Sequence, residues 1–204
     1  MDKIKKTAKG IDIFVAVIQI SVAISAVIML AFMIVELVAP ETVQNLSDTE
    51  GVVTEVSFGN VDVKLKNADA FIGDLGRFFA LAAIPNFIKL VAMFVALIFI
   101  RRFLKPMKLG ETPFAEGNYK NLFVVGWMTL ITAIITGIIN VICEQALYEN
   151  FYFENIFNMD VVESVSVEYT LFSTAPIAVA LVIFFFAYIF KYGEQLQKES
   201  DETL

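Results

Sequence analysis

The chain has 204 residues, of which 58% are hydrophobic and 18% charged, and its formal net charge is −7 at pH 7. Soluble domains carry about 25% charged residues, so this composition disfavours a soluble fold. The absence of histidine removes the commonest general base and the commonest metal ligand. The single cysteine, Cys143, excludes an intramolecular disulfide.

Four apolar runs predict four transmembrane helices. A run of about 20 residues, rising 1.5 Å per residue, crosses the roughly 30 Å hydrocarbon core of a bilayer. The runs cover residues 13–38, 78–100, 122–146 and 171–190, and we expect helices over about 11–39, 75–103, 113–146 and 169–194. The first run is too long for the core of a signal peptide, so it is interpreted as a retained helix. The predicted fold class is an all-α membrane protein, a single domain over residues 1–204 with a four-helix bundle.

The first outer segment, residues 40–74, contains an alternating pattern that predicts a β-hairpin around Gly59-Asn60. The expected cross-strand pairs are Thr54 with Leu65, Glu55 with Lys64, Val56 with Val63 and Phe58 with Val61. A similar alternation at residues 161–168, in the second outer segment (147–168), predicts a third strand. An isolated hairpin is only marginally stable in water, so a three-stranded sheet is expected, formed within one chain or between two.

The loop over residues 103–118 carries helix-stop and helix-start signals. Pro106 and Gly110 are expected to end the second helix, and Thr112-Pro113 is typical of a helix start, which predicts that the third helix begins there. The fourth helix is expected to continue past Lys191 for a turn or more before it frays.

Basic residues gather at one end of the predicted helices. Eleven of the 15 Lys and Arg flank the two termini and the 103–118 loop. The positive-inside rule then predicts that both termini and this loop are cytoplasmic. Most acidic residues fall in or next to the two outer segments, which argues against direct nucleic-acid binding by that face. The basic rim predicts contact with the anionic headgroups of the lipid bilayer.

Short motifs in the loop and the tail carry a resemblance. They are Arg101-Arg102-Phe103, Gly110-Glu-Thr-Pro-Phe114, Asn118 with Leu122 ahead of Gly126, and the tail from Phe190 to Leu204. Together with the four-helix layout, these motifs resemble the bacterial membrane family known as domain of unknown function 2975. The resemblance implies a small multi-pass protein of the bacterial cytoplasmic membrane, often encoded beside a small helix-turn-helix regulator. It assigns no catalytic residues. The surface expected to meet a cytoplasmic partner comprises Arg101, Arg102, Pro113, Phe114 and Asn118.

Lys89 is the principal polar residue inside a predicted span, twelve residues before Arg101 and therefore about 18 Å above the inner boundary. An ionisable group at that depth is costly and is expected to find a partner. The available groups are Glu36, Asn140 and Glu144. Two interpretations stay open: an ion or small-ligand site, or a structural lysine that extends its amine toward the interface.

Two functions are consistent with these sequence features. The first is a non-enzymatic regulator or sensor that engages a cytoplasmic protein, such as a small helix-turn-helix regulator. The alternative is a small transporter or channel subunit that uses Lys89. A membrane enzyme is disfavoured because the sequence lacks histidine, a carboxylate pair within the spans and a nucleophile motif. No cofactor is expected, and a homo-oligomer is left open by the small residues Gly126, Ala133 and Gly137.

Overall fold

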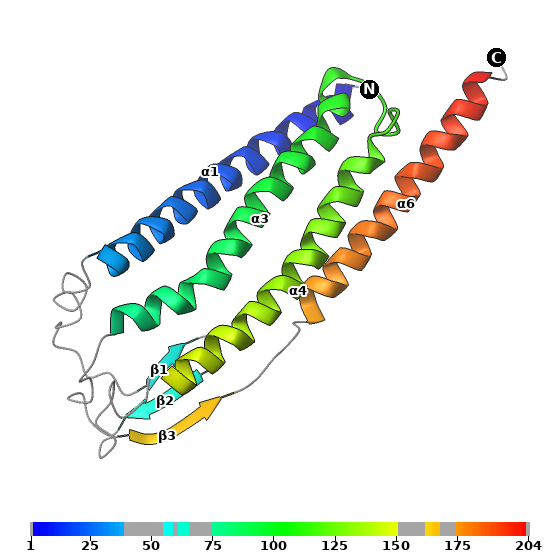
Figure 1. The fold of residues 1–204 in the computed structure, drawn as a ribbon. Coiled ribbons are helices and arrows are strands. Elements are labelled where there is room, and N and C mark those ends of the chain that lie inside the picture. The colour runs from blue at the N-terminus through cyan, green and yellow to red at the C-terminus, as the bar shows by residue number, and fades with distance from the viewer. Residues whose placement is uncertain are drawn as a thin grey trace. The chain divides into compact units, whose positions relative to one another are not determined.

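The computed structural model describes residues 2–38, 55–58, 61–65, 75–150, 162–167 and 174–202 (Figure 1). These residues form the helices α1 (Asp2–Val38), α3 (Leu75–Leu109), α4 (Tyr119–Asn150) and α6 (Thr174–Glu202), and the strands β1 (Glu55–Phe58), β2 (Val61–Leu65) and β3 (Val162–Val167). Contacts divide the chain into two compact units. The first comprises Met1–Ala26, Lys89–Ile134 and Ser173–Leu204, and the second comprises Val27–Ile88 and Ile135–Phe172.

Each of the four described helices contains a segment long and apolar enough to cross a membrane. The segments are Lys3–Val35, Ala83–Leu109, Tyr119–Cys143 and Thr174–Glu202. Large apolar side chains cover much of their outer surface; Phe14, for example, is 66% exposed and Phe185 is 64% exposed. Such surface is unfavourable in water and suits a lipid environment. The prediction of four membrane-length helices is confirmed.

Within the first unit, α1 packs against α3. Val15 and Val22 of α1 are buried together with Leu97 of α3. Half-buried apolar side chains surround this core, namely Ile18, Leu90, Phe94 and Ile100. The two helices run in opposite directions, because α1 begins at the end of the unit where α3 finishes (Figure 1).

The helices α4 and α6 pack through aromatic rings and small residues. The Phe184 ring of α6 lies 5.3 Å from the Trp127 ring and 6.0 Å from the Phe123 ring, centroid to centroid. Ala180 and Ala187, one heptad apart on α6, are fully buried. Small side chains allow helix backbones to approach closely in a membrane, so this face of α6 is built for close packing.

The helix α3 ends through a glycine cap. Gly110 has a φ of +94°, and its N–H donates to the Met107 carbonyl at 3.2 Å, while the Glu111 N–H donates to the Pro106 carbonyl at 3.0 Å. These two bonds form the Schellman motif, in which a left-handed residue satisfies the last helical carbonyls. Gly110 therefore ends the helix, whereas Pro106 lies within it.

The helix α4 begins at Tyr119, so the predicted start at Thr112-Pro113 is wrong. The Thr112 hydroxyl accepts the Phe114 N–H at 2.9 Å, which forms a local turn in place of a helix cap. Gly117, with a φ of +69°, then redirects the chain into α4. The fourth helix extends beyond Lys191 as expected and reaches Glu202.

In the second unit, the three strands form an antiparallel sheet in the order β1-β2-β3. Glu55 lies opposite Lys64, Val56 opposite Val63 and Phe58 opposite Val61, and β2 pairs in turn with β3 from Val61↔Val167 to Leu65↔Val162. The strands lie where the sequence alternates, with a register shift at Lys64/Leu65. The turn Gly59-Asn60 and the expected partner Thr54 fall outside the described residues.

The close contact at Gly126 can be tested directly. A Cβ at Gly126 would lie 2.7 Å from Cε1 of Phe184, whose ring is fixed between Phe123 and Trp127. We expect Gly126→Ala to lower the free energy of unfolding by about 1–3 kcal/mol, measured by thermal unfolding in a mild detergent.

The matched control is Gly10→Ala in α1, where the added Cβ meets nothing within 4 Å. This change removes backbone freedom from the unfolded chain, so stability should stay constant or rise by up to about 1 kcal/mol. Equal effects of the two substitutions would contradict close packing at Gly126.

Candidate functional site

The buried face of α1 follows a heptad-like spacing that includes two polar residues. It comprises Ala8, Asp12, Val15, Gln19 and Val22, separated alternately by four and three positions. This is the spacing by which paired helices interdigitate along a common seam. Asp12 and Gln19 are only 8% and 9% exposed, so α1 turns them toward its neighbour rather than toward the surface.

A matching series runs along α3 in the opposite direction. It comprises Leu90, Phe94, Leu97, Arg101, Leu104 and Lys108, again separated by four and three positions. The first three members, Leu90, Phe94 and Leu97, supply apolar contacts to α1. Arg101 and Lys108, which flank Leu104 in this series, are cations that meet the polar positions of α1.

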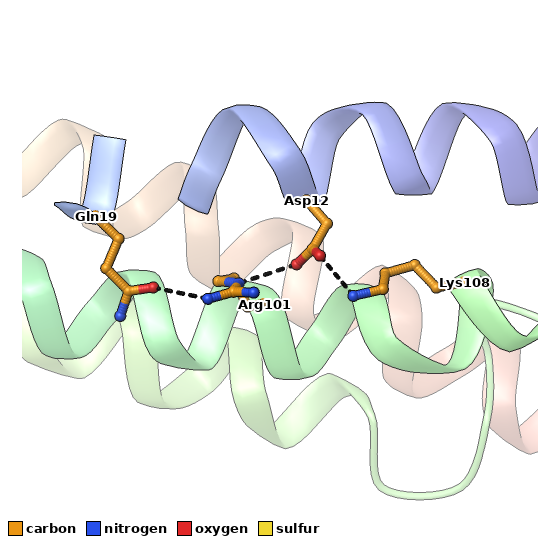
Figure 2. A network of polar contacts seen from close by, with 4 residues as sticks. All are labelled: Asp12, Gln19, Arg101 and Lys108. Atoms are coloured by element: carbon orange, nitrogen blue, oxygen red, sulfur yellow. Dashed lines mark hydrogen bonds and ion pairs between the residues drawn. The ribbon is translucent and has the colours of Figure 1, made fainter. Parts of the chain in front are cut away.

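Four residues at this junction form a polar network, called here the Asp12 cluster: Asp12, Gln19, Arg101 and Lys108. Figure 2 shows the Asp12 carboxylate between two cations of α3. Arg101 Nε donates to Asp12 Oδ1 at 3.0 Å, and Lys108 Nζ donates to Asp12 Oδ2 at 2.5 Å. Arg101 also donates through Nη1 to Gln19 Oε1 at 3.2 Å. Both carboxylate oxygens of Asp12 are therefore engaged by charged donors.

The burial of Asp12 explains why two cations are needed. The side chain of Asp12 is 11% exposed, against 42% for Arg101 and 29% for Lys108. A carboxylate withdrawn from water loses several kcal/mol of hydration unless donors replace the water. Arg101 and Lys108 replace it while their own charges stay partly solvated, which lowers the desolvation cost of the network.

An open cavity of about 310 Å³ adjoins the Asp12 cluster. Its lining adds Ile98, Arg102 and Lys105 to Asp12, Gln19, Arg101 and Lys108. The lining thus contains four cations and one carboxylate. The Arg102 guanidinium lies 5.0 Å from the centre of the Phe99 ring, within the range of a cation–π contact.

The loop of residues 110–118 is fastened to the end of α6. The Thr112 hydroxyl donates to Gln197 Oε1 at 3.0 Å, and the Gly117 N–H donates to Glu194 Oε2 at 3.0 Å. The Phe114 ring packs against Gly193, where a Cβ would lie only 2.4 Å from the ring. We call these contacts the loop–tail latch.

Two further residues extend the latch to α3. The ring of Phe190 lies 5.5 Å from that of Phe114 and 4.9 Å from that of Phe103 in α3. Asn118, which is 5% exposed, donates from Nδ2 to the carbonyls of Phe103 and Pro113, each at 3.1 Å. The loop is therefore bound on one side to α3 and on the other to α6.

The predicted partner surface is largely occupied by these internal contacts. Asn118 is buried, Phe114 and Pro113 are half-buried, and Arg101 holds Asp12. Arg102 is exposed at the cavity. The structure thus brings these five residues to one end of the first unit. Arg101 and Asn118 stabilise the packing there, and Arg102 is exposed.

Lys89 lies in the first unit near the start of the span Ala83–Leu109, and it is exposed. Of its predicted partners, Asn140 is half-buried in the second unit, and the side chains of Glu36 and Glu144 fall outside the described residues. Among the residues that the structure describes, no group of three or more Cys, Asp or Glu side chains could hold a metal ion.

Asp12, Gln19 and Lys108 are functional-site residues that the sequence-based prediction lacks. Two signals in the chain could have found them. Asp12 immediately precedes the first apolar run and Arg101 immediately follows the second, so antiparallel helices place both at one membrane boundary. In addition, the pairs 12/19 and 101/108 are each seven residues apart, which puts each pair on one helix face.

The Asp12 cluster predicts a measurable coupling between α1 and α3. Asp12→Asn keeps the side-chain shape but leaves Arg101 and Lys108 without their counter-ion. We expect a loss of about 1–3 kcal/mol in the free energy of unfolding, reduced from the value for a fully buried pair because both cations are partly solvated.

A double-mutant cycle of Asp12→Asn with Lys108→Gln, followed by denaturant or thermal unfolding in detergent, should give a coupling energy of about 0.5–3 kcal/mol. The control cycle uses Lys120→Gln in place of Lys108→Gln. Lys120 is exposed on α4, and none of its described contacts is with Asp12. Additive effects in both cycles would show that the ion pair between Asp12 and Lys108 contributes nothing to stability.

No protein-family model, curated protein or solved structure matches this chain. The resemblance to domain of unknown function 2975 therefore stays a prediction that depends on the loop and tail residues.

Proposed function

We propose that this protein is a non-enzymatic membrane regulator or sensor that engages a cytoplasmic protein through the end of the first unit that carries the loop–tail latch. This end, called here the loop end, contains the start of α1, the 110–118 loop and the last turns of α6 (Figure 1). The proposal extends to a bacterial cytoplasmic membrane with both termini on the cytoplasmic side.

Charge supports this orientation. Lys3, Lys5, Lys6 and Lys9 belong to the start of α1, while Arg101, Arg102, Lys105 and Lys108 belong to the end of α3. These residues and Lys191 fall at the ends of apolar segments, where the positive-inside rule weighs them most. The loop end is accordingly the cytoplasmic end in this proposal.

One observation carries the proposal: α6 continues as a helix from Lys191 to Glu202, beyond its apolar run, and the latch holds it. A tail that served only to end a membrane helix would need no such fastening. Residues 191–202 form a helix that contacts the loop at Gly193, Glu194 and Gln197, so they present a preformed surface, and preformed surfaces bind without the entropy cost of ordering.

This tail exposes an apolar pair. Tyr192 is 62% exposed and Leu196 is 48% exposed, and a spacing of four residues puts both on one face of α6. The latch uses Gly193, Glu194 and Gln197, which lie on a different face of the same helix. Tyrosine and leucine that project from a cytoplasmic helix can dock into the groove of a protein partner. A small helix-turn-helix regulator, which the family resemblance implies, is the partner proposed here.

The test is co-purification from native membranes in a mild detergent, followed by mass spectrometry. The test variant is Tyr192→Ala with Leu196→Ala, which removes the apolar pair and keeps the latch residues. We expect recovery of a small DNA-binding protein to fall by about tenfold or more, because anchor residues at an interface contribute most of its affinity.

The matched control is Lys198→Ala, on the opposite side of the same helix, where the side chain is 78% exposed. With this control variant, recovery of the DNA-binding protein should stay within about twofold of the recovery with the intact chain. A truncation after Tyr192 is less informative, since it also removes Glu194 and Gln197 from the latch. If no DNA-binding protein is recovered with the intact chain, or if the test variant retains it, the proposed function is wrong.

A further inference from the structure

We infer that the cavity beside the Asp12 cluster binds the phosphate group of an anionic phospholipid. The cavity lies between α1 and α3 at the loop end, and its volume of about 310 Å³ is at the lower end of the range for small-ligand pockets. This inference is independent of the proposed function, because it concerns a lipid and not a protein partner.

The charge balance of the cavity calls for an anion. Asp12 neutralises part of the charge of Arg101 and Lys108, since each of its oxygens accepts from one of them. Arg102 and Lys105 also line the cavity, and among the described residues neither has a carboxylate partner. Two positive charges at one wall thus have no counter-ion among the described residues, and a phosphate supplies both the charge and several acceptor oxygens.

The geometry of the donors also favours a phosphate. Residues 98, 101, 105 and 108 follow one another at spacings of three and four along α3, so they share one helix face. The acceptors in the lining are already used, because Gln19 Oε1 accepts from Arg101 and both oxygens of Asp12 accept from cations. What remains open in the cavity is a set of donors, which suits a ligand that only accepts.

The surroundings distinguish a lipid from a free phosphate ion. Directly beyond Asp12, α1 exposes Ile13, Phe14 and Val17 at 65%, 66% and 56%. These side chains belong to a membrane-length segment, as do Val91 and Met93, which are exposed on α3. A polar cavity bordered by exposed apolar helix surface matches an amphiphile, with its headgroup among the cations and its acyl chains along the helices.

The position of the cavity agrees with the depth of a headgroup. Arg101 follows the second apolar run directly, and Asp12 directly precedes the first, so the cavity lies at the boundary of the hydrocarbon layer. Basic pockets between membrane helices at this level are suited to lipid phosphates. The lysines at the start of α1 add to the positive potential around it.

The test uses the full chain, purified in a non-ionic detergent and stripped of lipid, with native mass spectrometry to count bound lipids. Phosphatidylglycerol is the probe, phosphatidylcholine with the same acyl chains is the neutral lipid, and inorganic phosphate is the water-soluble anion. The test variant is Arg102→Gln with Lys105→Gln, because both side chains are exposed and neither belongs to the Asp12 cluster. The control variant, Lys120→Gln with Lys191→Gln, removes the same charge elsewhere in the first unit.

We expect the Kd of the first phosphatidylglycerol to rise about 30-fold in the test variant, since each basic residue near an anionic headgroup contributes about fivefold. The control variant should change this Kd less than about threefold. The binding of phosphatidylcholine should be the same in the intact chain and in both variants. If the test variant fails to fold, Lys105→Gln alone should give about a fivefold change.

Three results would overturn the inference. Equal weakening of phosphatidylglycerol binding in the test and control variants would show that the general surface charge, and not the cavity, causes the effect. Unchanged phosphatidylglycerol binding in the test variant would remove the cavity as the site. Saturable binding of inorganic phosphate that the test variant abolishes, with no such dependence for phosphatidylglycerol, would assign the site to a free anion.

Discussion

The carboxylate of Asp12 is the constraint on which the first unit depends. Apolar helices in a membrane slide past one another at little cost, because lipid and side chains offer similar surroundings. A buried carboxylate removes this freedom, since only one alignment brings Arg101 and Lys108 to its two oxygens. A polar residue at a seam position fixes register in paired helices in the same way. The Asp12 cluster therefore fixes the alignment of α1 against α3.

From this fixed pair, contacts continue through the rest of the first unit. Phe103, two residues after Arg101, packs against Phe190 of α6, and the backbone carbonyl of Phe103 accepts from Asn118. The glycine cap at Gly110 then turns the chain into the loop, whose hydroxyl and backbone groups hold α6. In the described part of the first unit, the ion pairs of the Asp12 cluster and the hydrogen bonds of the latch lie at one end, while apolar faces form most of the helix length. This division is what a bilayer demands of a protein that must also present a structured surface to water.

The four helices could be predicted from the sequence because length and apolar content alone decide whether a helix spans a membrane. Their ends were harder to place. Residues 2–10 and 191–202 are helical although polar, because packing and the latch extend the helices beyond their apolar runs. The expected helix start at Thr112-Pro113 failed because the Thr112 hydroxyl is used within the loop and toward Gln197. The sequence predicts a surface role for Arg101 and Asn118, but their contacts with Asp12 and with the Phe103 carbonyl depend on tertiary packing. Asp12 is hard to predict as a buried residue because it lies at the edge of an apolar run, close to the lysines at the start of α1.

The separation of 89 residues between Asp12 and Arg101 has a consequence for biosynthesis. The first helix leaves the ribosome well before its counter-charges exist. At about 5–20 residues per second, α1 waits on the order of 5–20 s for Arg101 to be synthesised. During this interval Asp12 has no partner on α3, and its place beside the membrane surface lets water hydrate it. Insertion of α3 then exchanges that water for Arg101 and Lys108. The order of synthesis thus makes the docking of α1 a late event, completed only when the second span has entered the bilayer.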